Sequence, residues 1–349
     1  MTTEQPGPYN AITDVPGILV GQFERTDAPY LTGTTVVHVP ASAVAGVDVR
    51  GGAPGTRETD LLDPVNSNPG ANAIVLTGGS AFGLDAASGV MAALEKLGQG
   101  VRVGPGELDV VPIVPTAVLF DLGRGGGFQA RPDRDWGRQA FEAASGGPVA
   151  EGNYGAGAGA RVGGLKGGVG TASVRLADGT TVGALVIVNA AGSAVDAEGR
   201  LYGARYGLAD EFAGLRTPTE PAPDLPGRIP GMNTVIAVVA TDASLDKATA
   251  KRMAMVAHDG LARAIDPIHT LVDGDSIFAL STGKEARLSV TDPAVLLQLE
   301  TIFAAGARTL SRAVVRAVLA AETVETPAGK MLSYRDAYPS AVDSDVRPE

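Results

Sequence analysis

The chain has 349 residues, of which 44% are hydrophobic and 19% charged, and its formal net charge is −11. This length allows one large domain or two ordinary ones with substantial cores, and the acidity argues against a nucleic-acid partner, which would need a basic face. Cysteine is absent, which excludes disulfides, thiolate zinc sites and a cysteine nucleophile.

Strands and helices are predicted in mixed order along the chain, which favours a layered architecture that combines both. Apolar and β-branched runs predict strands at Thr34–Val39, Ala73–Leu76, Val110–Phe120, Thr181–Asn189, Thr234–Ala240 and Ser276–Leu280. Helical spacing of apolar residues predicts helices at Ala81–Leu97, Asp133–Ala144, Leu245–Ile265 and from Pro293 to about Ala321. Ser244 is the predicted N-cap of the third helix, and Thr291 or Asp292 that of the last.

The segment Leu215–Met232 differs from the rest because it holds five prolines and few apolar residues. Such a composition predicts an exposed, partly extended linker. The part of the chain from Thr234 onward is only 116 residues long, and it opens with a strand that looks central to a sheet. We therefore expect a single domain over residues 1–349, with the linker inside it.

The N-terminus has neither a basic region nor an apolar region typical of a signal peptide. Gly, Asn and Asp interrupt the best apolar window, so no membrane span is predicted. The expectation is a soluble cytoplasmic protein without a membrane partner.

Two familiar kinds of binding site find little support. The three histidines, His38, His258 and His269, lack the HxxxH or HxH spacing of a metal site. The glycine-rich segment Gly152–Gly170 fits neither the Walker A nor the GxGxxG template of phosphate loops. No metal or cofactor is predicted. Taken alone, Lys166 in that segment reads as a solvated loop lysine, although a packed glycine-rich turn would let it set the electrostatics of a site.

Three polar residues at strand ends each allow an ordinary and a functional interpretation. Asp273-Gly274-Asp275 precedes a strand, and Asp-Gly is strongly favoured in turns. Two carboxylates at this spacing could also orient a nucleophile and its base. Asn189 ends a buried strand and could cap a turn or donate to a developing oxyanion.

The junction Asn233-Thr234 lies where the proline-rich segment meets a buried strand. If the Thr234 hydroxyl attacks the preceding carbonyl, hydrolysis of the resulting ester frees a new N-terminus. The Thr234 α-amine is then the general base for its own hydroxyl. Such an amine titrates near 7.7–8.0 in model peptides, so no histidine is needed.

Ordered motifs over nearly the whole chain resemble the DmpA/BapA-type self-processing aminopeptidases, with the nylon-oligomer hydrolase NylC and the pantetheine hydrolase ThnT as relatives. The motifs are Ala11–Gly21, Val47–Pro64, Leu76–Val90, Val111–Leu122, Gly155–Ser173, Asn233–Ile265 and Pro267–Gly283. The resemblance implies an α/β/β/α four-layer sandwich similar to N-terminal nucleophile hydrolases. It also implies cleavage into an α chain, 1–233, and a β chain, 234–349, that stay together in a homo-oligomer, with a tetramer favoured.

By position, the resemblance assigns the nucleophile to Thr234 and base tuning and the oxyanion to Lys166 and Asn189. It assigns the acidic pair of the threonine branch to Asp273 and Asp275. Serine-type members carry Ser-Gly-Glu at that pair, so the Asp-Gly-Asp of this chain is similar to the NylC side.

One departure concerns the oxyanion. Phe120 stands where some members of the family have a tyrosine that is thought to help stabilise it. This leaves the oxyanion to Asn189 and backbone donors, or moves its stabilisation elsewhere.

The predicted function is a self-processing amide hydrolase without a cofactor, acting on small peptides or oligoamides. The Asp-Gly-Asp branch favours linear ω-amino-acid oligoamides such as 6-aminohexanoate oligomers. An aminopeptidase acting on short peptides or β-peptides is the close alternative. An unprocessed, non-catalytic homologue that serves as a binding or scaffold protein is the alternative from another class.

Overall fold

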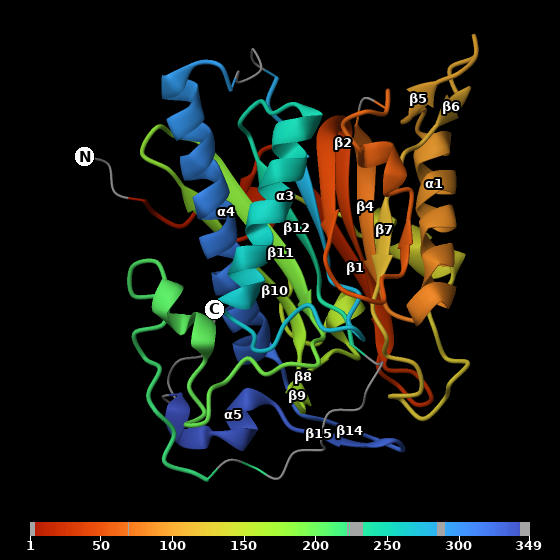
Figure 1. Ribbon diagram of the computed structural model, residues 1–349. Coiled ribbons are helices and arrows are strands. Elements are labelled where there is room, and N and C mark those ends of the chain that lie inside the picture. The colour runs from red at the N-terminus through yellow and green to blue at the C-terminus, as the bar shows by residue number, and fades with distance from the viewer. Residues whose placement is uncertain (1–3, 69, 222, 224–232, 285–289, 343–349) are drawn as a thin grey trace.

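The computed structural model describes residues 4–68, 70–221, 223, 233–284 and 290–342. Two halves of a sheet pack face to face, and helices cover the outer side of each (Figure 1). The order of layers is therefore helix, sheet, sheet, helix, which confirms the predicted α/β/β/α sandwich.

The long strand β2, Thr32–Val49, joins the two halves. Its first part pairs with β1, Leu19–Arg25, and with β4, Ala71–Thr77, while Val44–Val49 pairs with β13, Ser276–Ser281. The pairing of β2 with β4 shifts register between His38 and Ala43. Ser42 in this interval has a φ of 59°. Bulges of this kind bend a strand, so β2 can pass from one half to the other.

The order of the strands is β10-β11-β12-β13-β2-β4-β7-β3, with β1 beside β2. The remaining strands of this sheet are β10 Gly168–Arg175, β11 Thr181–Val188, β12 Ile236–Thr241, β7 Thr116–Val118 and β3 Thr56–Arg57. Small hairpins outside this sheet are formed by β5 Val101–Arg102 with β6 Val110–Val111, β8 Arg161–Val162 with β9 Leu165–Lys166, and β14 Val324–Thr326 with β15 Gly329–Met331.

The helices are α1 Ala86–Lys96, α2 Arg134–Glu142, α3 Lys247–Ala262, α4 Pro293–Ala320 and α5 Tyr334–Ala337. The helices α3 and α4 cover one outer face, and α1 lies on the opposite side (Figure 1). Successive side chains of β12 point to opposite faces of the sheet, and both faces are buried, which explains why the strand is apolar throughout. Val238 packs between the two halves of the sheet, and Val239 packs under α3 and α4, as expected of a strand buried on both faces.

Several predicted elements need correction. The expected strand Val110–Phe120 is two short strands, because Pro112 and Pro115 interrupt it and proline cannot donate to a ladder. The helix predicted from Ala81 begins as a 3₁₀ turn, Ser80–Asp85, before α1 starts.

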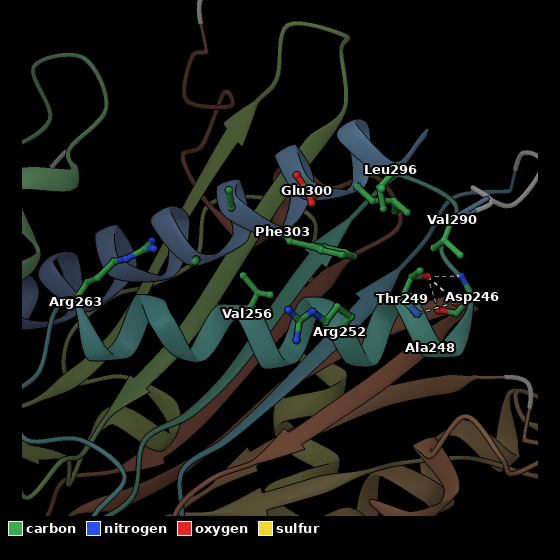
Figure 2. A pocket seen from close by; sticks show the side chains of 13 residues that line it. Asp246, Ala248, Thr249, Arg252, Val256, Arg263, Val290, Leu296, Glu300 and Phe303 are labelled. Carbon is green, nitrogen blue, oxygen red and sulfur yellow. Dashed lines mark hydrogen bonds between the residues drawn. The ribbon is translucent and has the colours of Figure 1, made fainter. Parts of the chain in front are cut away.

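The caps of the later helices give one correction and one confirmation. Asp246, not Ser244, caps α3, since its carboxylate accepts from Thr249 N at 2.7 Å (Figure 2). Asp292 caps α4 as expected.

The predicted linker Leu215–Met232 lies partly outside the described residues. Its beginning pairs with the last residues that the structure describes. Leu215 pairs with Val342, and Arg216 N donates to Ala341 O at 2.9 Å. Among the described residues, no helix is both long enough and apolar enough to cross a membrane.

Candidate active site

Strand register brings three segments of the sequence to one edge of the sheet. Because β11 and β12 are antiparallel with Ile187 opposite Ile236, continuing the register places Asn189 opposite Thr234. Because β12 and β13 are parallel with Ile236 opposite Ser276, Gly274 falls on the other side of Thr234. The hydrogen bonds agree: Thr234 N donates to Asn189 O at 2.5 Å, and Gly274 N donates to Thr234 Oγ1 at 3.1 Å.

Thr234 is buried, with 5% of its surface exposed, and lies two residues before β12. Its hydroxyl donates to the carbonyl oxygen of Asn233, the peptide that joins the two residues. Gly274 must be small here, since a Cβ on it would lie 2.7 Å from Ala53 O and 3.0 Å from Thr234 Oγ1. The hydroxyl is therefore enclosed between its own preceding carbonyl and a backbone donor.

The side chain of Asn189 has a fixed orientation. Its Oδ1 accepts from Arg124 Nη1 at 2.6 Å and from Arg161 N at 3.0 Å. Its Nδ2 donates to Phe120 O at 3.3 Å. Two donors on Oδ1 leave only one amide orientation compatible with the network. The second Nδ2 hydrogen has no acceptor among the described residues, which is what an oxyanion donor requires. Phe120 thus contributes its carbonyl to the site.

Lys166 is fully buried in β9, so it is not a solvated loop lysine. Its Nζ donates to Gly157 O at 2.9 Å and to Gly167 O at 2.8 Å. Burial lowers the pKa of Lys166 to about 7; the Arg124 charge adds to this effect and Asp121 opposes it. A neutral amine that makes these two bonds keeps a lone pair, so Lys166 can hold or release a proton near neutral pH.

The buried Asp121 and the half-buried Arg124 are members of the site that the sequence did not identify. Arg124 bonds Asn189 and also donates to Gly159 O at 2.5 Å. Burial lowers the pKa of Arg124 to about 10, with Asp121 opposing the shift and Arg161 adding to it. Burial raises the pKa of Asp121, whose Oδ1 accepts from Gly79 N at 2.7 Å. The available signal was their place within four residues after the apolar run that ends at Phe120.

Asp275 ties the strand that follows the nucleophile to a histidine. Its Oδ1 accepts from Val235 N at 2.7 Å. Its Oδ2 accepts from His269 N at 3.0 Å and from His269 Nδ1 at 2.8 Å. With 0% exposure, this carboxylate is held by three donors. It positions the backbone next to Thr234 and does not bond the Thr234 side chain.

Asp273 is also buried, and both of its carboxylate oxygens accept hydrogen bonds. Its Oδ2 accepts from Thr270 Oγ1 at 2.6 Å, and its Oδ1 accepts from Ala191 N at 3.4 Å. Burial raises the pKa of Asp273, and Asp275 adds to that effect. That the two carboxylates orient the nucleophile and its base stays a prediction, and neither carboxylate bonds the Thr234 side chain. Among the described residues, it is the N–H of Gly274 between them that reaches Thr234.

Two of the three histidines come together despite their separation in sequence. The rings of His258, on α3, and His269 meet edge to face with centroids 4.7 Å apart. His258 Nε2 lies 3.1 Å from Asp48 O, and burial lowers the pKa of His258 to about 4. The spacing of the histidines in the sequence tests His269 only as a metal ligand; its position six residues before Asp275 is the signal for this contact. His38 lies elsewhere, against Gln99.

A separate pocket of about 510 Å³ opens between α3 and α4, with apolar side chains such as Val256 and Phe303 pointing into it (Figure 2). None of the residues that line it belongs to the cluster around Thr234. The structure thus brings all five predicted site residues, Thr234, Lys166, Asn189, Asp273 and Asp275, to the sheet edge, apart from this pocket.

Comparison with known proteins places the chain in a family. The sequence profile of Peptidase family S58 matches residues 10–332. The chain belongs to this family. An uncharacterized aminopeptidase of Mycobacterium leprae (strain TN) is 49% identical to it over 341 residues, covering 91% of this chain and 92% of the relative. A 6-aminohexanoate-oligomer endohydrolase of Paenarthrobacter ureafaciens is 34% identical over 289 residues, covering 77% and 74%.

Solved structures agree on the architecture. A Burkholderia sp. beta-aminopeptidase is similar with a TM-score of 0.71 and 26% identity, covering 100% of this chain and 98% of that chain. The L-aminopeptidase D-Ala-esterase/amidase of Ochrobactrum anthropi, described as a variant of the Ntn hydrolase fold, has a TM-score of 0.71 at 24% identity, covering 95% and 93%. This S58 protein therefore has an N-terminal nucleophile hydrolase-like fold, and its family is one of peptidases and amide hydrolases.

Proposed function

We propose that this S58 protein cuts its own Asn233–Thr234 bond and then hydrolyses amides with the freed Thr234. The observation that carries the proposal is the hydroxyl of Thr234, which donates to the carbonyl oxygen of Asn233. The hydroxyl thus lies against the carbonyl group that it would attack. The Gly274 N–H donates to Thr234 Oγ1 and limits the positions that this oxygen can take.

In the self-cleavage step, Thr234 Oγ1 bonds the carbonyl carbon of Asn233, and the carbon–nitrogen bond of that peptide breaks. The Thr234 nitrogen takes up a proton and becomes an amine, leaving an ester between the two residues. Water then hydrolyses the ester, giving the Asn233 carboxylate and restoring the Thr234 hydroxyl. Lys166, with a pKa of about 7, supplies a group that exchanges protons in the same buried cluster.

In turnover, the Thr234 amine accepts the proton of its own hydroxyl as Oγ1 attacks the substrate carbonyl. The free hydrogen on Asn189 Nδ2 is suited to stabilise the developing oxyanion, because Arg124 and Arg161 N fix the amide. The leaving amine departs with a proton, and water hydrolyses the acyl ester on Thr234.

The substrates that we propose are short peptides or linear oligoamides. The Asp-Gly-Asp sequence and the relatives named 6-aminohexanoate-oligomer endohydrolases support oligoamides. The relatives of higher identity named aminopeptidases support peptides with a free terminal amine. An assay of N-terminal amino-acid p-nitroanilides beside linear 6-aminohexanoate oligomers separates the two, since only an aminopeptidase requires an amine next to the scissile bond.

The mechanism is tested by replacing the hydroxyl. Wild-type protein should separate on a denaturing gel into pieces of about 23 and about 12 kDa, estimated by dividing 35.2 kDa in proportion to residue number. Thr234→Ala should stay as one band without hydrolase activity, because it lacks the nucleophile. Thr234→Ser, which keeps a hydroxyl, is the matched control and should still split.

Two results would reject this mechanism. One is a Thr234→Ala variant that still splits at Asn233. The other is a Thr234→Ala variant that hydrolyses amides at the wild-type rate. A wild-type protein that remains one band and hydrolyses nothing would instead favour the non-catalytic scaffold.

A further inference from the structure

Arg161 differs from the other charged residues of the site because its guanidinium is unused. Its backbone N–H bonds Asn189 Oδ1 at 3.0 Å, which places the residue beside the proposed oxyanion donor. The side chain is partly buried. Its guanidinium has no hydrogen bond, ion pair or ring contact with any of the residues that the structure describes.

The surroundings of Arg161 are cationic. Lys166 is its partner in the β8–β9 hairpin, and the charge of Arg161 is near enough to lower the pKa of Arg124. Asp121 is the acid whose charge acts on both Arg124 and Lys166. Among the described residues, one buried carboxyl lies with two guanidiniums and the Lys166 amine, which leaves this side of Thr234 short of negative charge.

The acids on the other side of Thr234 do not correct this imbalance. Asp275 is occupied by Val235 and His269, and Asp273 by Thr270 and Ala191. A partly desolvated cation without a partner is unfavourable unless an anion joins it. The planar fork of a guanidinium suits a carboxylate especially well, because it can make two parallel hydrogen bonds.

We propose that Arg161 is a specificity-determining residue that binds a carboxylate on the leaving-amine side of the substrate. This inference rests on the proposed function. In a linear peptide or oligoamide, the terminal carboxylate always lies on the leaving-amine side of the amide that is cut. The substrate class is therefore a short peptide or oligoamide whose free carboxylate lies within about one residue of the scissile bond.

The test compares a dipeptide that has a free carboxylate with its C-terminal carboxamide, and the 6-aminohexanoate dimer with its carboxamide. Wild-type protein should prefer the acid of the pair it cleaves by about 10- to 100-fold in KM, the range expected for a hydrogen bond to a charged group. Arg161→Met should lose this preference by weakening binding of the acid, with kcat/KM for the carboxamide within about twofold of wild type.

Two matched variants complete the design. Arg161→Lys keeps the charge but loses the fork, and should keep part of the preference. Arg252→Met, on the exposed side of α3, should leave the acid-to-carboxamide preference unchanged for the dipeptide and for the 6-aminohexanoate dimer. Denaturing gels establish that each variant has split before its kinetics are compared.

Each contrary result has a distinct meaning. Equal cleavage of acid and carboxamide by wild type overturns the inference while leaving the amide hydrolase in place. Slower self-cleavage of Arg161→Met with an unchanged acid-to-carboxamide ratio also overturns it, and assigns the guanidinium to the new Asn233 carboxylate. If wild type splits into two pieces but cleaves neither acids nor carboxamides, the inference and the proposed function both fail.

Discussion

Thr234 lies between two charged flanks that differ in how fully their side chains are hydrogen-bonded. On one flank, the carboxylates of Asp273 and Asp275 each accept hydrogen bonds from the loop that precedes them and from one backbone N–H of a neighbouring segment. On the other flank, Lys166 uses two of its donors on carbonyls, and Arg161 has no side-chain partner among the described residues.

The difference matters because groups whose hydrogen bonds are all made and groups with an unused donor or lone pair can serve different functions. A carboxylate with three donors has a fixed position, and it can fix the backbone that it holds. A cation with an unused donor, or an amine with a free lone pair, can still exchange a proton or bind an incoming group. We therefore interpret the acidic flank as the part that positions Thr234 and the cationic flank as the part that meets the substrate.

The largest expected effect comes from a substitution in the acidic flank, which is formed by Asp273 and Asp275. Asp275→Asn removes the charge that accepts from Val235 N and from both donors of His269. A small displacement of a nucleophile costs about 100-fold in rate, so self-cleavage and turnover should each fall by at least about that factor. Time courses on denaturing gels measure the first, and kcat on the best amide measures the second.

Asp135→Asn, on the exposed side of α2, is the control and should split at the wild-type rate. If Asp275→Asn also splits at the wild-type rate, the acidic flank does not position Thr234. Its bonded carboxylates would then serve stability alone.

The next effect, on the cationic flank, depends on pH. Burial holds the pKa of Lys166 at about 7 in the folded protein, below its ordinary value of 10.5. Between these values the unfolded chain binds a proton that the folded chain does not, so the free energy of unfolding rises with pH from about 7 upward. Below pH 7 the buried charge is present and the stabilisation is absent.

Lys166→Met should remove this dependence. The measurement is urea denaturation from pH 6.5 to 9.5 in a Thr234→Ala background, which keeps one chain. When Lys166 is present, the free energy of unfolding should rise by at most about 1.4 kcal/mol per pH unit. The rise should be smaller when the same background also carries the Lys166→Met substitution. In the processing-competent protein, this substitution should lower kcat by about 10- to 100-fold. Equal slopes with and without Lys166 would show that its amine stays charged.

The strands that form this edge of the sheet could be predicted from the sequence, because apolar runs determine where strands begin and end. The strands near Asn189, Thr234 and Asp275 were predicted from such runs, and antiparallel and parallel pairing then placed their ends together. The family resemblance supplied the roles, since Lys166 by itself reads as a loop residue. Its burial depends on glycine-rich backbone from Gly157 and Gly167 packing around it, which composition alone does not reveal.

What the sequence could not supply are the partners of each side chain. Arg124 reaches Asn189 across 65 positions, and no local pattern indicates such a contact. Metal-site spacing does not indicate the contacts of His258 and His269, which are with each other and with a backbone carbonyl or a carboxylate. The break in Val110–Phe120 could have been predicted, because its two prolines cannot donate to a central ladder.

The smallest expected effect tests whether the acidic flank needs an imidazole or only a donor. His269 has a φ of 59°, a conformation that asparagine tolerates better than most residues. His269→Asn can donate to Asp275 Oδ2 in place of Nδ1, so kcat should stay within about threefold of wild type. His269→Ala has no donor, and the loss of one hydrogen bond predicts a kcat about tenfold lower with KM unchanged.

Rescue by asparagine is the decisive part of this comparison. A merely structural defect at the left-handed position would lower the thermal stability of the alanine variant without separating kcat from KM. If His269→Asn is as slow as His269→Ala, and the pH profile of kcat changes shape in both, the imidazole itself moves a proton. The acidic flank would then take part in the chemistry, and the division of work between the two flanks of Thr234 would be wrong.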